Sequence, residues 1–220
     1  MAQGLKDAGI AVHLFKDEIN TAPDSVFPNN WFSTHSGGHV AIYPMYSENR
    51  WRERRSDIIE MLKSEYRVQD VIDYSGLEKD AIFLEGTGAM VLDHIARVAY
   101  VARSNRANDI ALERFCTHFN FELMVFEAVD RNGKPIYHTN VLMCIGTDFA
   151  LLGTRSIPDA VRRQEIVARL EEAGRQVIEL SLEQIANFAG NAIGSVRCML
   201  AGIHLSRRTS VTARSSFTAE

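Results

Sequence analysis

Residues 135–146 read Pro-Ile-Tyr-His-Thr-Asn-Val-Leu-Met-Cys-Ile-Gly, and the interpretation of the whole chain starts from this stretch. A polar trio, His138 to Asn140, stands at the entrance of an apolar run that ends in glycine. This pattern predicts a buried strand over 138–145 with a histidine at its mouth. Histidine is the side chain most easily tuned to exchange protons near neutral pH. If the protein carries out chemistry, we expect that chemistry here.

The composition is that of a globular protein. The chain has 220 residues, 46% hydrophobic and 24% charged, which suits one large or two small domains with a proper core. A net charge of −4 and a pI of about 6.0 argue against a nucleic-acid-binding protein. No apolar stretch approaches the roughly 18 residues of a membrane span, and the first residues lack the apolar region of a signal peptide. We therefore expect a cytoplasmic protein without membrane partners.

One order of elements, strand, strand, helix, strand, runs through the chain three times. A short helix over 2–10 and a strand over 10–15 come before it. Helical spacing follows from Trp51 to Leu62, from Leu112 to Phe119 and from Pro158 to Gly174, and the charged run 50–55 is expected to be a mostly solvated face. Ser181 and Gln184 have the spacing of a capping box. Strands of the repeated units are expected at 39–43, 67–72, 89–93, 98–103, 121–129, 138–145, 149–154 and 176–180.

Four polar residues occupy similar places at the start of successive units. Asn30, Glu85, His138 and Asn191 follow one another at spacings of 55, 53 and 53 residues. Such self-similarity is the signature of a repeat architecture in which each unit brings one inner strand to a shared axis. The fold class expected is α/β, with repeated β-β-α-β units, and the four polar side chains are expected to converge.

The repeat breaks in the fourth unit. If the repeat continued, residues 187–191 would be followed by roughly fifty residues of hairpin, helix and strand. Instead, the stretch GSVRCM (194–199) follows after only two residues. The last fifteen residues, from Ser206, are rich in Ser, Thr and Arg. We expect an internal deletion and a missing first strand, with a single domain over 1–205 and a disordered tail over 206–220.

The chain has three cysteines, Cys116, Cys144 and Cys198, and no CxxC spacing, so neither a disulfide framework nor a zinc site is indicated. Cys116 on a helix and Cys144 in an apolar strand are predicted to be core residues. Cys198 follows Arg197, and a neighbouring cation favours the nucleophilic thiolate. Taken alone, Cys198 and His138 are each more often structural residues than catalytic ones.

The other polar candidates can also be explained by purely structural roles. Glu85-Gly-Thr-Gly88 is either a tight turn with an exposed acid or a functional acid, and it lacks the lysine of a phosphate loop. Asn29 and Asn30 can serve backbone groups in a turn. Arg106 is either solvated or a bidentate carboxylate ligand. The shared repeat position favours the functional readings, because it brings acid, histidine and amides to one axis.

At these residues the sequence resembles the amidinotransferase and arginine deiminase superfamily. It looks closest to the arginine-deiminase-related proteins that include the citrulline utilisation proteins. The resemblance covers nearly the whole chain in the right order. It rests on PDSVFPNNW (23–31), FLEGTG (83–88), YHTN (137–140), NFAGN (187–191) and GSVRCM (194–199).

The resemblance implies a pentein fold, a fivefold pseudosymmetric α/β propeller, here incomplete. It also implies a cysteine nucleophile that attacks the central carbon of a guanidino or ureido group and forms a covalent intermediate. On that basis Cys198 is the nucleophile, His138 the general acid and base, and Glu85 the acid that orients and charges His138. No metal or cofactor is implied.

The resemblance also suggests substrate contacts. Asp24 matches a position that holds the amino-acid end of the substrate, and Arg106 matches an arginine that binds its carboxylate. Asn30 stands where relatives commonly have an aspartate, and an amide both donates and accepts, so we hypothesise a preference for a neutral ureido group such as that of citrulline. The remaining members of the expected substrate-binding set are Asn29, Asn140 and Asn191.

The function expected is hydrolysis of a C–N bond in a small arginine- or citrulline-like amino acid, without a cofactor. Transfer of the amidino group to an acceptor amine uses the same thiol chemistry and stays open. An inactive remnant that acts as a binding module also stays open, because a propeller lacking a blade exposes sheet edges and core, which favours self-association. A small-molecule substrate and self-association into homo-oligomers are the only partners expected.

Overall fold

The computed structural model describes residues 2–7, 9–17, 22–195, 198–201 and 213–215, of which 193–195, 198–201 and 213–215 are described by their backbone alone. Within this part of the chain the strands form four three-stranded sheets, in the orders β1-β2-β3, β4-β5-β6, β7-β8-β9 and β10-β11-β12. In each of the first three sheets an antiparallel hairpin is followed by a parallel third strand. The strands are β1 (Phe32–His35), β2 (His39–Ile42), β3 (Asp70–Asp73), β4 (Met90–Asp93), β5 (Val98–Ala102), β6 (Glu122–Phe126), β7 (Met143–Ile145), β8 (Phe149–Leu152), β9 (Gln176–Glu179), β10 (Ala192–Ser195), β11 (Cys198–Ala201) and β12 (Ala213–Ser215).

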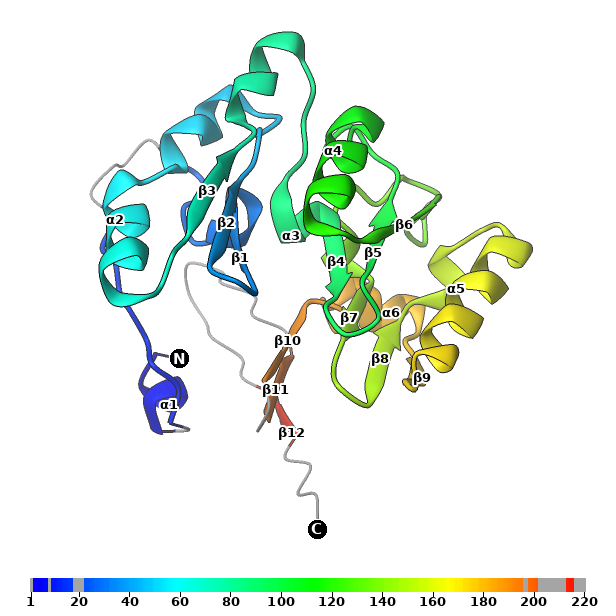
Figure 1. Ribbon diagram of the computed structural model, residues 1–220. Helices are drawn as coiled ribbons and strands as arrows, with labels where there is room; N and C mark the ends of the chain where they lie inside the picture. Colours follow the sequence, from blue (N-terminus) through cyan, green and yellow to red (C-terminus); the bar gives the residue numbers. More distant parts are fainter. Residues whose placement is uncertain (1, 8, 18–21, 196–197, 202–212, 216–220) are drawn as a thin grey trace.

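A helix connects the second and third strands of each of these three sheets, which confirms the β-β-α-β order (Figure 1). Figure 1 shows α2 and α5 on opposite outer sides of the molecule. The connecting helices are α2 (Ser56–Glu65), α4 (Asp109–Phe119) and α5 (Ala160–Glu172). The shorter helical elements are α1 (Ala2–Asp7), η1 (Pro28–Asn30), η2 (Glu48–Glu53), η3 (Ser75–Asp80), α3 (Gly86–Ala89), η4 (Thr139–Val141), η5 (Thr154–Ser156) and α6 (Leu182–Ala186).

Local sequence explains where several helices begin and end. The Asn108 and Asp159 side chains accept hydrogen bonds from free backbone N–H groups at the starts of α4 and α5. The predicted capping box of Ser181 and Gln184 is confirmed at the start of α6. Gly174 follows α5 with a φ of +82°, a conformation that glycine adopts without steric cost. These short-range signals therefore fix the ends of helices that sequence periodicity only outlines.

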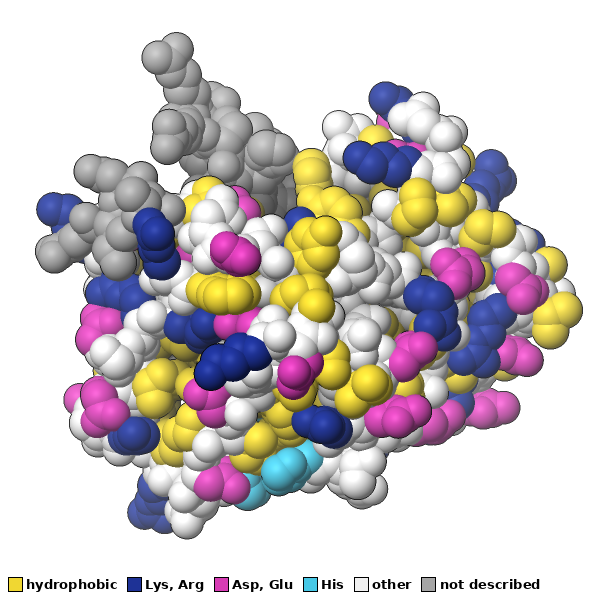
Figure 2. Space-filling view, turned by 90° about the horizontal axis from the view of Figure 1, so that it is seen from above, with side chains coloured by type: hydrophobic (Ala, Val, Ile, Leu, Met, Phe, Trp, Pro, Cys, Tyr) yellow, Lys and Arg dark blue, Asp and Glu magenta, His cyan; other side chains and the backbone are white. Residues whose placement is uncertain are grey.

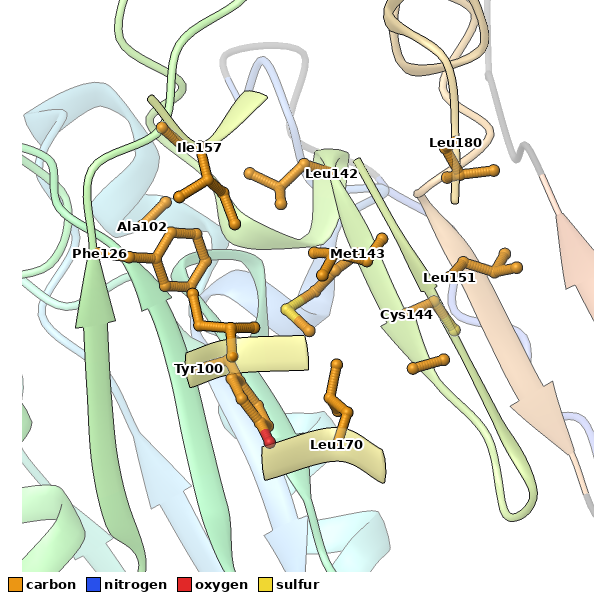
Figure 3. Close-up of a cluster of buried hydrophobic side chains, with 14 of the residues drawn as sticks. Tyr100, Ala102, Phe126, Leu142, Met143, Cys144, Leu151, Ile157, Leu170 and Leu180 are labelled. Carbon is orange, nitrogen blue, oxygen red and sulfur yellow. The ribbon is translucent and has the colours of Figure 1, made fainter. Parts of the chain in front are cut away.

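The largest buried cluster lies between the second and third sheets. Figure 3 shows Tyr100 and Phe126 on one side of this cluster, facing Leu142 and Met143. Every residue of β5 is buried, so this strand is enclosed on both faces. The prediction that Cys116 and Cys144 are core residues is confirmed, since both are 6% exposed. The core thus joins neighbouring units and holds the starts of their first strands together.

The structure corrects three predicted elements. Residues 10–15 contain no strand. The expected strand over 138–145 is instead η4 followed by the short β7, because His138 caps a helical turn before the chain extends. The run 50–55 is not a mostly solvated face: η2 ends at Glu53, and Arg50 and Glu53 are 4% and 2% exposed as a hydrogen-bonded ion pair. Pairing makes this burial tolerable, and the sequence spacing alone gave no sign of the partner.

The fourth sheet includes part of the stretch expected to be a disordered tail. Backbone hydrogen bonds pair Ala213–Ser215 with β11. The rest of 206–220 lies outside the described residues, so the tail and the domain boundary at residue 205 stay predictions.

Two surface features bear on partners. None of the helices in the described ranges is long and apolar enough to cross a membrane. On the face shown in Figure 2, basic and acidic side chains are interspersed over the coloured residues. The expectation that nucleic acid and membranes are not partners stays a prediction.

Candidate active site

The short helical turns at the starts of the first three units meet one another. Phe27, Glu85 and His138 are the residues immediately before η1, α3 and η4. The structure therefore refines the repeat: Glu85 and His138 are equivalent, whereas Asn30 comes at the end of its turn, three residues after Phe27. Asn30 still joins them, because a Cβ at Gly88 would lie 2.2 Å from the Asn30 side-chain amide and 3.3 Å from His138 Cε1. Only glycine at position 88 lets the three turns approach so closely.

A buried carboxylate and an imidazole form the centre of this meeting point. Glu85 is fully buried, and its Oε2 lies 2.7 Å from Nε2 of His138. The His138 side chain is 12% exposed, so one edge of the ring reaches the surface. The predicted partnership of Glu85 and His138 in space is thus present, although the two residues are 53 positions apart.

Two arginines complete the environment of Glu85. Arg106 Nη1 donates to both carboxylate oxygens at 2.8 Å, and Arg50 Nη1 lies 3.5 Å from Oε2. The backbone N–H of Tyr46 also donates to Oε1 at 3.1 Å. Glu85 therefore lies among two guanidinium groups, an imidazole and a backbone amide, a set of partners that compensates a buried charge.

Burial and partners set the protonation of this pair. Burial acts to raise the pKa of Glu85, but hydrogen bonds and charges from His138 and Arg106 outweigh it and lower the pKa to about 2. Burial lowers the pKa of His138 below 6.5, and the opposing attraction of Glu85 does not cancel it. The lowering of the Glu85 pKa does not require a charged His138, because the Arg106 guanidinium is positively charged throughout this pH range. Glu85 is therefore a carboxylate at neutral pH and His138 is mainly neutral.

This protonation assigns the two ring nitrogens of His138. A carboxylate only accepts hydrogen bonds, so Nε2 carries the hydrogen that faces Glu85. In the neutral ring Nδ1 then holds a free lone pair. His138 is consequently arranged to accept a proton at Nδ1 and to return it, with Glu85 stabilising the charged form in between.

The expected substrate-binding residues of the first unit lie around Arg50. With its amide oxygen facing Arg50, the buried Asn30 accepts hydrogen bonds from Nη1 and Nη2 at 3.2 Å. Asp24 Oδ2 lies 3.6 Å from Arg50 Nε, and its side chain is 47% exposed. The backbone carbonyl of Asn29 accepts a hydrogen bond from Thr87 at 3.3 Å. Asp24 and Asn30 are therefore brought together through an arginine that sequence reasoning placed on the surface.

The remaining predicted residues, Asn140 and Asn191, differ in their distance along the chain from His138. Asn140 lies within η4, two residues after His138, and Asn191 immediately precedes β10. Gly190 packs so closely on Val141 that a Cβ there would lie 2.4 Å from its carbonyl oxygen. The start of the fourth unit therefore lies against η4, as the repeat predicts. The roles of Asn29, Asn140 and Asn191 in substrate binding stay predictions.

Cys198 is the first residue of β11. Its backbone pairs with Ser195 at the hairpin end of β10, whereas Ala192, at the end near η4, pairs with Ala201. The three residue steps from Ala192 to Ser195 span about 10 Å along a strand. The side chain of Cys198 lies outside the described residues, so its place relative to His138 stays a prediction.

Sequence reasoning missed Arg50 and its partner Glu53. Arg50 donates to Glu53 through Nε and Nη2 and also contacts Asp24, Asn30 and Glu85. The i, i+3 spacing of the two residues was visible, but the same spacing occurs in solvated surface pairs. Only the contacts made by other units distinguish this pair.

Metal binding was not expected, and that expectation is not tested. Among the residues that the structure describes, no group of three or more His, Cys, Asp and Glu side chains is arranged to hold a metal ion.

Comparisons with known proteins agree with the fold. The N-terminal domain of ArgZ, an arginine dihydrolase from the ornithine–ammonia cycle in cyanobacteria, is 20% identical with a TM-score of 0.69, and the match covers 90% of this chain and 67% of that one. AgrE, in a ternary complex with ornithine and NAD+, is 20% identical with a TM-score of 0.69, covering 90% and 27%. A dimethylarginine dimethylaminohydrolase adduct with 4-chloro-2-hydroxymethylpyridine is 16% identical with a TM-score of 0.62, covering 90% and 70%. At these identities the likeness establishes the fold alone.

The sequence comparison adds the family. A comparison with curated proteins gives no match. The family model for eukaryotic N,N-dimethylarginine dimethylhydrolase matches residues 1–194, which is most of the chain. The protein therefore belongs to the N,N-dimethylarginine dimethylhydrolase family, a hydrolase family of the amidinotransferase and arginine deiminase superfamily, and has the pentein fold of that superfamily.

Proposed function

We propose that the protein hydrolyses a C–N bond in the guanidino or ureido group of a small arginine- or citrulline-like amino acid, with Cys198 as the nucleophile. The observation that carries the proposal is the Glu85–His138 pair, 2.7 Å apart and joined by Arg106, in a chain of a hydrolase family. This is the arrangement of a general base and the group that orients it. Structures of ArgZ include one covalently bonded to a reaction intermediate, which supports a covalent route for that relative.

The proposed reaction has two halves. Neutral His138 first accepts the proton of the Cys198 thiol at Nδ1, and the resulting thiolate attacks the central carbon of the substrate. A C–S bond forms, and the C–N bond to the leaving amine breaks as the amine takes that proton from Nδ1. Nδ1 then accepts a proton from water as the water oxygen attacks the same carbon. The C–S bond breaks and the thiolate is restored. Glu85 stabilises the protonated imidazole in both halves, because its carboxylate accepts the Nε2 hydrogen bond throughout.

The charges around Asn30 support a neutral ureido substrate. Asn30 contacts the Arg50 guanidinium at 3.2 Å, and a second guanidinium placed beside it would be repelled. An amide can instead donate to a ureido oxygen. We expect kcat/KM for citrulline to exceed that for arginine, and Asn30→Asp to reverse the order. Faster turnover of arginine by the unsubstituted protein would show this substrate assignment to be wrong.

The thiol assignment is tested by alkylation. We expect 2-chloroacetamidine to modify Cys198 selectively, because an activated thiolate reacts faster than a buried thiol. Cys116 and Cys144 are internal controls, since both are 6% exposed and burial raises the pKa of Cys116 to about 11. Mass spectrometry of the modified protein locates the label, and Cys198→Ser should remove it.

The same experiment examines whether Cys198 and His138 act together. This is the decisive question, because Cys198 pairs with Ser195, at the end of β10 away from η4. His138→Ala should slow modification of Cys198. Equal labelling of all three cysteines, or a Cys198 rate no faster than that of a free thiol such as glutathione, would count against a nucleophilic Cys198.

A further inference from the structure

The Arg106 side chain lies between two tyrosine rings. Its Cζ is 4.7 Å from the ring centroid of Tyr137 and 5.4 Å from that of Tyr46. Both distances are within the range of cation–π attraction. Tyr137 and Tyr46 are 49% and 42% exposed, whereas the Arg106 side chain between them is 20% exposed. The rings therefore cover a cation that would otherwise face water.

Each tyrosine is fixed by contacts of its own. The backbone N–H of Tyr46 donates to Glu85, and its ring meets Phe83 edge-on at a centroid distance of 5.2 Å. The carbonyl of Tyr137 accepts a hydrogen bond from Ser104 Oγ at 2.9 Å. Each ring is thus held by a contact other than the one it makes with the Arg106 guanidinium.

The second ring also touches the imidazole. The ring centroids of Tyr137 and His138 are 4.9 Å apart. Ser104 Oγ in turn accepts a hydrogen bond from the backbone N–H of Arg106 at 3.2 Å. Tyr137 therefore contacts Arg106 in two ways, through its ring and through Ser104, and its ring also contacts His138.

The three residues come from three different units. Tyr46 follows β2 of the first unit, Arg106 follows β5 of the second, and Tyr137 precedes η4 of the third. An arginine side chain carries about 2 kcal/mol of rotamer entropy, so contacts beyond the ion pair with Glu85 help to hold it in one geometry. The two ring faces restrict the Arg106 side chain to rotamers that keep Nη1 on Glu85. The two rings also keep the remaining N–H donors of the Arg106 guanidinium in a fixed orientation.

We infer that Tyr46 and Tyr137 are positioning residues, an aromatic clamp that holds Arg106 on Glu85 so that its remaining donors meet the carboxylate of an amino-acid substrate. The inference rests on the proposed function for the identity of that ligand, but the clamp itself is a property of the described contacts. Its physical consequence for the site is that the Arg106 cation stays close to His138. That nearby charge is one of the causes that lower the pKa of His138.

Four variants of the clamp test the inference. Tyr46→Leu and Tyr137→Leu remove a π face, whereas Tyr46→Phe and Tyr137→Phe keep it and remove only a hydroxyl. A cation–π contact of this kind contributes about 1 kcal/mol, which corresponds to roughly a fivefold change in binding. We expect each Leu variant to raise KM for the preferred substrate about fivefold with kcat little changed, and each Phe variant to match the unsubstituted protein.

The second readout does not need activity. The pKa of His138, followed by NMR of its ring protons, should rise in the Leu variants and stay unchanged in the Phe variants, because a released Arg106 no longer repels the protonated ring. Tyr66→Leu is the matched control, since Tyr66 is 47% exposed and its ring meets that of His13 edge-on. It should alter neither KM nor the titration of His138.

The outcomes separate the two proposals. If the unsubstituted protein turns over none of the substrates tested, the proposed function fails and the His138 titration still decides the clamp. An unchanged His138 pKa in both Leu variants would overturn the clamp, as would Phe variants that behave like the Leu variants. If one Leu variant does not fold, the other tests the same Arg106 contact from the opposite ring face.

Discussion

Replacing Glu85 with glutamine is expected to lower the free energy of unfolding by about 3 kcal/mol at neutral pH. The amide would leave Arg106 and Arg50 without the carboxylate that they share, and Arg50 is only 4% exposed. A buried charge without its partner costs more than the pair contributes when intact. Urea unfolding followed by circular dichroism measures the difference between the two proteins.

The pH dependence of that difference identifies its cause. The folded-state pKa of Glu85 is about 2, below the ordinary 4.5, so the carboxylate contributes stability that is fully present above about pH 4.5. This contribution is lost as the pH falls from about 4.5 toward 2, because both folded and unfolded forms become protonated. The unsubstituted protein should therefore lose its advantage over Glu85→Gln across that window.

A surface carboxylate provides the control for Glu85. The Glu60 side chain is 68% exposed and pairs with Lys63, so Glu60→Gln should change the free energy of unfolding by less than about 0.5 kcal/mol. A Glu85→Gln protein as stable as the unsubstituted one would show that Glu85 does not hold the site together. So would a difference that stays constant down to pH 2.

Replacing His138 with alanine is expected to reduce kcat for the preferred substrate about 10³-fold, the usual size of a general acid–base contribution. The ring is 12% exposed and shares its Nε2 hydrogen bond with Glu85, which retains Arg106 in the variant, so the fold should persist. Steady-state kinetics measures the loss, and circular dichroism verifies the fold.

The pH profile gives the second half of this prediction. Because burial lowers the pKa of His138, the acidic limb of kcat/KM, where His138 becomes protonated, should lie below the pH 6.5 expected of a free histidine. His138→Ala should lose that limb. His13→Gln is the control, since His13 is an exposed histidine that contacts Tyr66. Activity within fivefold of normal in His138→Ala would remove His138 from the mechanism.

Much of the architecture follows from the sequence by itself. The regular spacing of polar residues predicted repeated β-β-α-β units, and the quoted motifs indicated the superfamily that the family comparison confirms. The pairing of Glu85 with His138 followed from their equivalent places in two units. Capping at Ser181 and burial of Cys116 also followed, because both depend on neighbours a few residues away.

Other parts of the site depend on contacts between units, and only the tertiary structure decided them. Arg50 looked like a surface residue until Asp24, Asn30 and Glu85 were placed around it. Arg106, expected to bind a substrate carboxylate, first of all binds Glu85.

The sequence therefore determined the repeated unit and the two residues at its matched positions, since periodicity and turn chemistry are encoded locally. The tertiary structure decided which charges are buried and which aromatic rings cover them. A charge becomes tolerable in the interior only through partners from distant parts of the chain, and no local pattern of residues records those partners.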